Sequence, residues 1–89
     1  MAEFPVMSEA DYEQQVIERT RFARECSGLT QAAVAKALGV PADRYRKWES
    51  QSPMPNRYVP RFAIVVRAER DWILWCEGQA PKPLAERVA

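Results

Sequence analysis

The sequence predicts an all-α domain of five short helices, and three observations support this fold class. Apolar residues recur three and four positions apart, as they do along one face of a helix. The first two periodic segments begin after Ser8 and Thr30, which are good N-caps, and end at Gly28 and Gly39. The chain has 89 residues, the size of one small domain, and 47% of them are hydrophobic, which argues against a disordered chain.

The first predicted helix runs from Ser8 to Gly28. The Ser8 hydroxyl can cap its backbone, and Asp11 lies in the first turn, where the helix dipole favours a negative charge. One face carries the periodic residues Tyr12, Val16, Thr20 and Ala23. Gly28 then suits the left-handed conformation just past the last turn.

Two shorter helices follow, separated by Gly39. The second covers about residues 31–38, and Pro41 fixes φ for the first turn of the third. Tyr45 and Trp48 are three residues apart in that third helix and should share its buried side.

Residues 50–57 are polar, contain two prolines and are expected to form a loop. Pro60 suits the start of a fourth helix, which carries Phe62, Val65 and Val66. A strand over 58–66 is the alternative, because the segment is rich in β-branched residues, but Pro60 argues against a central strand. A last short helix should hold Trp72 and Ile73.

These elements place one domain over residues 8–78, between a flexible acidic arm over 1–7 and a C-terminal tail over 79–89. The longest apolar runs have five residues, far fewer than the roughly 20 that a membrane helix needs. No signal peptide is visible at the N-terminus. We therefore expect a cytoplasmic, nucleoid-associated protein without a membrane role.

Charge is unevenly distributed although the net charge is only +1. Residues 1–18 hold five acidic residues and no Lys or Arg. Residues 19–67 hold ten basic and three acidic residues, and 68–89 hold three basic and four acidic residues. A basic middle between acidic ends suggests an anionic partner, although an uneven solvated surface explains the charge equally well.

The sequence offers little for an enzyme active site or a metal site. The chain has no histidine, the commonest general base and metal ligand. Cys26 and Cys76 lie far apart in the sequence and form no CxxC pair, so we expect two free thiols, no metal and no disulfide. We expect neither an enzyme nor a cofactor, and no small-molecule ligand is evident.

Residues 31–50 form a unit of two short helices joined by a tight turn at Gly39, which is a helix-turn-helix. Ala35 is small where the two helices must cross. The residues that should bury the unit against the other helices are Val34, Leu38, Val40, Tyr45 and Trp48. Burial of that side leaves an opposite face of Ala42, Asp43, Arg46 and Lys47, which fits the major groove of DNA.

At these residues the sequence resembles the Cro/C1-type (XRE) helix-turn-helix family, and most closely the DNA-binding domains of lambdoid phage repressors. The matching blocks are Arg24-x-x-x-Gly28-Leu29-Thr30-Gln31, Val34-Ala35-x-x-Leu38-Gly39-Val40, Trp48-Glu49, Arg57-Tyr58-Val59-Pro60 and Asp71-Trp72-Ile73-Leu74. The resemblance covers about residues 16–78. One departure is Arg67-Ala68, which replaces a glycine that the family has before its last helix.

The resemblance implies a five-helix lambda-repressor-like fold that binds a pseudo-palindromic operator as a homodimer, and a repressor that occludes a promoter. It implies a phosphate contact for Gln31 and base contacts for Ala42, Asp43 and Lys47, with Arg44 and Arg46 beside them. Arg57 would approach the backbone and minor groove. It implies a structural ion pair between Arg24 and Glu49, and the dimer residues it implies are Asp71, Trp72, Ile73 and Leu74.

Each expected DNA contact has a simpler alternative. Arg46 and Lys47 could bind phosphate without reading bases, and Asp43 could pair with Lys47 inside its own helix. Ala42 could simply be a good helix former, Gln31 a solvated residue of the first turn, and Arg57 a solvent-exposed loop residue. At the level of function, the alternative is an antitoxin or accessory factor whose main partner is another protein.

Overall fold

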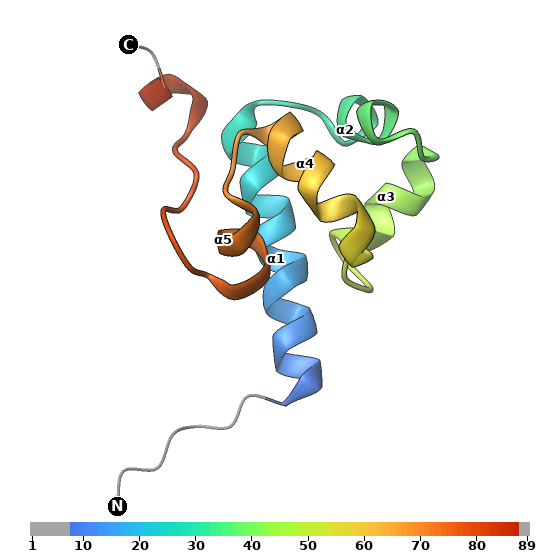
Figure 1. Cartoon of the computed structure of the whole chain (residues 1–89). Coiled ribbons are helices and arrows are strands. Elements are labelled where there is room, and N and C mark those ends of the chain that lie inside the picture. Colours follow the sequence, from blue (N-terminus) through green and yellow to red (C-terminus); the bar gives the residue numbers. More distant parts are fainter. Residues whose placement is uncertain (1–7, 88–89) are drawn as a thin grey trace, which may run out of the picture.

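A computed structural model describes residues 8–87, and in this range the chain is all-α (Figure 1). The predicted fourth helix is confirmed over residues 59–66, and the strand alternative for residues 58–66 is wrong. The arm over residues 1–7 lies outside the described range. The helices are α1 (Glu9–Ser27), α2 (Gln31–Leu38), α3 (Ala42–Trp48), α4 (Val59–Val66) and α5 (Arg70–Trp75), with turns of 3-10 helix η1 (Asn56–Tyr58) and η2 (Leu84–Arg87).

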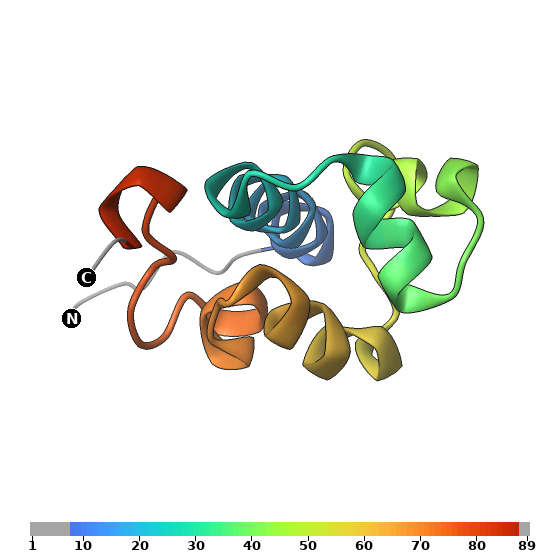
Figure 2. The same cartoon turned by 90° about the horizontal axis from the view of Figure 1, so that it is seen from above.

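The long helix α1 packs against α4 and α5, and α4 also contacts α2. Seen from above, α2 and α3 form one end, α4 and α5 follow one flank of α1, and the C-terminal segment lies at the opposite end (Figure 2). The described residues contain no helix that is both long enough and apolar enough to span a bilayer.

Local sequence signals set the helix ends as predicted. The Ser8 hydroxyl accepts a hydrogen bond from the Asp11 backbone N–H at 3.1 Å, and the Thr30 hydroxyl accepts one from Ala33 at 3.0 Å. Gly28 and Gly39 adopt left-handed φ values of 77° and 73° just past α1 and α2. The caps therefore fix where each of these helices starts and stops.

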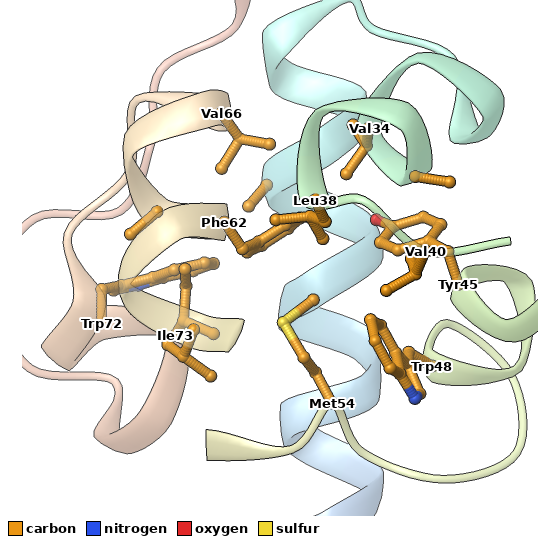
Figure 3. Packing of buried hydrophobic residues seen from close by; sticks show 14 residues of the cluster. Val34, Leu38, Val40, Tyr45, Trp48, Met54, Phe62, Val66, Trp72 and Ile73 are labelled. Carbon is orange, nitrogen blue, oxygen red and sulfur yellow. The ribbon is translucent and has the colours of Figure 1, made fainter. Parts of the chain in front are cut away.

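The hydrophobic core fills the space between α2–α3, α4–α5 and α1 (Figure 3). Phe62 of α4 lies in its middle, and its ring centroid is 6.3 Å from that of Tyr45. Trp72 and Ile73 extend the core toward α5. The predicted periodic face of α1 is also inward, since Val16, Thr20 and Ala23 are buried and Tyr12 is half-buried.

Arg19 of α1 fastens the short helix α5. Its Nε donates to the Ile73 carbonyl at 2.8 Å, and its Nη2 donates to the Leu74 carbonyl at 3.0 Å. These carbonyls belong to the last turn of α5, where the backbone lacks helical partners and a positive charge is favoured. Phe22 of α1 also packs on Trp72, with ring centroids 5.8 Å apart.

The C-terminal tail turns back onto the domain. The Glu69 carboxylate accepts from the Gln79 backbone N–H at 2.5 Å, and Arg87 donates to the Val66 carbonyl at 3.1 Å, at the C-terminal end of α4. Leu84 lies so close to Gly28 that a Cβ on this glycine would come within 2.9 Å of the leucine side chain. The described part of the tail is thus attached to the ends of α1 and α4.

Arg67 takes the left-handed conformation that closes α4, with φ 58° and ψ 49°. This conformation costs a residue with a Cβ about 1–2 kcal/mol, which glycine avoids at the expense of about 0.5–1 kcal/mol of chain entropy. We expect Arg67→Gly to raise the free energy of unfolding by up to about 1 kcal/mol in urea denaturation. Arg67→Ala, which keeps the Cβ, should give no gain, and an equal gain in both variants would contradict a backbone cause.

Candidate nucleic-acid interface

Helices α2 and α3 are separated by the three residues Gly39, Val40 and Pro41, where the sequence predicts the turn of a helix-turn-helix. Two backbone hydrogen bonds close the turn between them. The Val40 N–H donates to the Ala35 carbonyl at 3.0 Å, and the Gly39 N–H donates to the Lys36 carbonyl at 3.1 Å. Ala35 is buried, as its predicted place at the helix crossing requires. The predicted buried set of Val34, Leu38, Val40, Tyr45 and Trp48 is confirmed.

Two aromatic side chains orient α3. Tyr45 is 0% exposed and Trp48 is 6% exposed, and their rings meet edge to face with centroids 6.1 Å apart. Figure 3 shows both pointing into the core. Because they occupy the inward side of a helix of seven residues, the orientation of the opposite side is fixed.

The outward side of α3 is rich in cationic side chains. Arg44, Arg46 and Lys47 are all exposed, together with Asp43, while Ala42 is half-buried. Asp43 pairs with Arg46 at 3.1 Å, and not with Lys47 as considered from the sequence. Since this pair is open to solvent, it is weak enough to exchange for other partners. We call the set of residues 42–44, 46 and 47 the α3 face.

A buried polar network lies behind the α3 face and is centred on Glu49. Arg24 of α1 binds both carboxylate oxygens of Glu49, with Nε–Oε2 at 2.7 Å and Nη2–Oε1 at 3.1 Å. The Tyr45 hydroxyl donates to the same carboxylate, and the Gln31 amide donates to Oε1 at 3.1 Å. The carboxylate therefore joins α1, the start of α2 and the end of α3.

Burial and hydrogen bonding act in opposite directions on the ionisation of Glu49. Burial raises the pKa of its carboxyl group, but the bonds from Arg24, Tyr45 and Gln31 together outweigh it and leave the pKa below its ordinary value. The pKa of Arg24 is raised, mainly by its bond to Glu49. Burial, followed by the bond to Glu49, raises the pKa of Tyr45. The network is thus a charged pair with a neutral phenol at neutral pH.

The remaining predicted DNA contacts lie at the two ends of this unit. Gln31 is the first residue of α2, and its half-buried side chain is held by Glu49. Arg57 is exposed, and its guanidinium lies 5.1 Å from the centroid of the Tyr58 ring. Tyr58 in turn packs on Trp48, with centroids 5.0 Å apart, so Arg57 is placed next to the C-terminal end of α3.

The four residues expected at a dimer interface separate into two groups. Trp72 and Ile73 are buried in the core of the protomer, and Ile73 is fully inaccessible, so it cannot touch a second molecule in this conformation. Asp71 is exposed and Leu74 is half-buried.

Cys26 is buried and Cys76 is exposed, and both thiols are free.

The hydrogen bonds from Tyr45 and Gln31 to Glu49 did not follow from the sequence reasoning. One signal was available for the first, because Tyr45 and Glu49 are four residues apart at the end of α3, the spacing at which helical side chains meet.

Comparison of the chain with family models, with curated proteins and with solved structures returned no match.

Proposed function

We propose that this chain is a sequence-specific double-stranded DNA-binding regulator of transcription with a lambda-repressor-like helix-turn-helix. The observation that carries the proposal is the pair of opposite sides on α3. Tyr45 and Trp48 anchor one side in the core, and the other side presents Arg46 and Lys47 to solvent, with Arg44 exposed at its flank. A short helix held in this way can enter the major groove, where each base pair exposes a distinct pattern of donors and acceptors.

Each exposed group on the α3 face has a chemical match in that groove. Arginine or lysine can donate to O6 and N7 of guanine, a carboxylate such as Asp43 can accept from cytosine N4, and Ala42 can contact a thymine methyl group. The Asp43–Arg46 pair would separate on binding, at little cost because it is solvated. Gln31 and Arg57 would meet the sugar-phosphate backbone on either side.

The mode of regulation that we propose is repression by two copies bound to one site. Two copies would place their α3 helices in successive major grooves of a pseudo-palindromic site, with half-sites about 34–36 Å apart. A protein bound in this way across a promoter blocks access to it, so the proposed role is repression by occlusion.

Selection from a pool of random duplexes, followed by salt titration, tests the proposal. We expect an enriched motif, and an affinity for it that falls steeply with salt, with a slope of log K against log salt of about −0.9 for each phosphate neutralised. The proposal would be contradicted if no sequence is enriched and if the weak binding to DNA does not change with salt concentration.

A further inference from the structure

The C-terminal segment over residues 79–87 crosses the ends of two helices, and we call it the strap. It returns past the C-terminal ends of α4 and α1, at the opposite end of the molecule from α3 (Figure 2). Arg87 fixes its far end, because its Nη1 donates to the Val66 carbonyl at 3.1 Å and its Nε donates to the Lys82 carbonyl at 2.7 Å. One side chain therefore closes the turn of the strap and ties it to α4.

The Cys26 thiol lies close to the strap. Cys26 is 6% exposed, yet it does not belong to the core cluster between the helices. It is two residues from Gly28, which the Leu84 side chain approaches. Burial raises the pKa of the Cys26 thiol, the charge of Arg87 lowers it and that of Glu86 raises it, so both of these η2 residues are near the sulfur. We infer that the strap supplies part of the cover that keeps Cys26 from solvent.

The contacts that hold the strap are few. Of residues 79–87 only Pro81 is buried, and Arg87 is half-buried. The Arg87 Nη2 is buried without a hydrogen-bond partner among residues 8–87, and an unpaired buried donor destabilises the arrangement that contains it. A segment with little buried apolar surface opens at a lower cost in free energy than the core of a domain.

We propose that the strap opens and closes while the helices stay folded, and that it thereby controls the access of small electrophiles to the Cys26 thiol. In the closed state Arg87 is bound to α4 and the thiol is covered. In the open state the thiol can react. Cys76 is exposed in either state. The inference is independent of the proposed function, since the strap contains no residue of α2 or α3.

Alkylation of the native full chain by iodoacetamide, followed for each cysteine by peptide mass spectrometry, tests the inference. The thiolate sulfur displaces iodide and forms one carbon–sulfur bond. In the wild type we expect Cys26 to react at least about 10-fold more slowly than Cys76. Arg87→Ala should speed the reaction of Cys26 at least about 10-fold, as the loss of hydrogen bonds from a charged donor implies, and should leave Cys76 unchanged.

Electrostatics alone predicts the opposite change. The Arg87 charge lowers the pKa of Cys26, so its removal without opening would leave less thiolate and slow the alkylation. Arg61→Ala is the matched control, because it removes an exposed arginine of α4 that lies outside the strap, and it should leave the Cys26 rate unchanged. Leu84→Ala is a second strap variant and should also speed Cys26, since it shortens the side chain that approaches Gly28.

The dependence on urea separates strap opening from global unfolding. Below the unfolding transition, the Cys26 rate should rise with urea less steeply than the unfolding equilibrium constant, because opening of the strap exposes less surface. Three outcomes would overturn the inference. They are a wild type in which Cys26 reacts as fast as Cys76, a Cys26 rate that neither strap variant raises above that of Arg61→Ala, and a urea dependence as steep as that of global unfolding.

Discussion

Replacement of Glu49 by alanine is expected to lower the free energy of unfolding by about 3–5 kcal/mol, because it leaves a buried cation without its counter-charge. The side chain of Arg24 is only 15% exposed and that of Glu49 only 2%. The Tyr45 hydroxyl, which donates to the same carboxylate, would also lose its partner. Since small domains are stable by about 5–15 kcal/mol, a loss of this size should be evident in urea denaturation.

The control for this experiment is Glu25→Ala, which removes an exposed carboxylate from α1 and should change stability by less than about 0.5 kcal/mol. If Glu49→Ala lowers the free energy of unfolding by less than about 1 kcal/mol, the network contributes little to stability. That result would contradict its role in holding α1, α2 and α3 together.

The same carboxylate gives the stability a pH dependence of known sign. The folded protein holds the pKa of Glu49 below its ordinary value of 4.5, so the unfolded chain takes up a proton first as the pH falls. The contribution of Glu49 is therefore complete above about pH 5.5 and is lost as the pH falls through 4.5 toward the lower folded-state value. Glu49→Gln should flatten this part of a curve of unfolding free energy against pH, and an unchanged curve would contradict the assignment.

Lys47→Ala is expected to weaken binding to a selected DNA site by about 5- to 150-fold, as the loss of one base contact worth about 1–3 kcal/mol implies. Binding to scrambled DNA should weaken much less, because the base contact is made only at the selected site. A lost phosphate contact would instead weaken binding to all sequences alike. Lys47 is exposed on α3, so its removal should leave folding intact.

Lys82→Ala is the matched control for this variant, since it removes an exposed lysine from the tail, at the opposite end of the molecule from α3. Fluorescence anisotropy with both duplexes measures the two affinities. Equal losses on selected and scrambled DNA for Lys47→Ala would show that Lys47 binds phosphate and does not read bases.

The fold was predictable where the signals are local. Ser8 and Thr30 cap helices through their own hydroxyl groups, and Gly28 and Gly39 supply left-handed backbone, so neighbouring residues decide these helix ends. The inward side of α3 was predictable for a similar reason, because Tyr45 and Trp48 are the large apolar residues at helical spacing.

Contacts between distant segments could not be predicted in this way. Arg19 binds carbonyls at the end of α5, and Arg87 binds one at the end of α4. The sequence alone does not show whether an arginine side chain binds a distant carbonyl or points into solvent. The tail over 79–89 accordingly looked like a simple extension, although η2 packs against Gly28. The burial of Ile73 within the protomer likewise depends on how α1, α4 and α5 meet.

Arg67 shows how a departure from an expected pattern can be informative. The sequence places Arg67-Ala68 where the resemblance leads one to expect glycine, and the structure keeps the left-handed backbone at this position with φ 58°. Backbone hydrogen bonds close this turn, from the Arg67 N–H to the Ile64 carbonyl at 3.3 Å and from the Ala68 N–H to the Ala63 carbonyl at 2.9 Å, and arginine adopts the conformation in place of glycine.

Backbone NMR of the ¹⁵N-labelled protein, titrated with a selected duplex, tests most directly whether the outward side of α3 binds DNA. We expect large shift changes at residues 42–47 and at Gln31 and Arg57. The Trp48 indole N–H signal should change little, because this ring is buried in the core. Changes confined to the tail, α4 and α5, with α3 unaffected by a duplex that binds, would contradict DNA binding by α3.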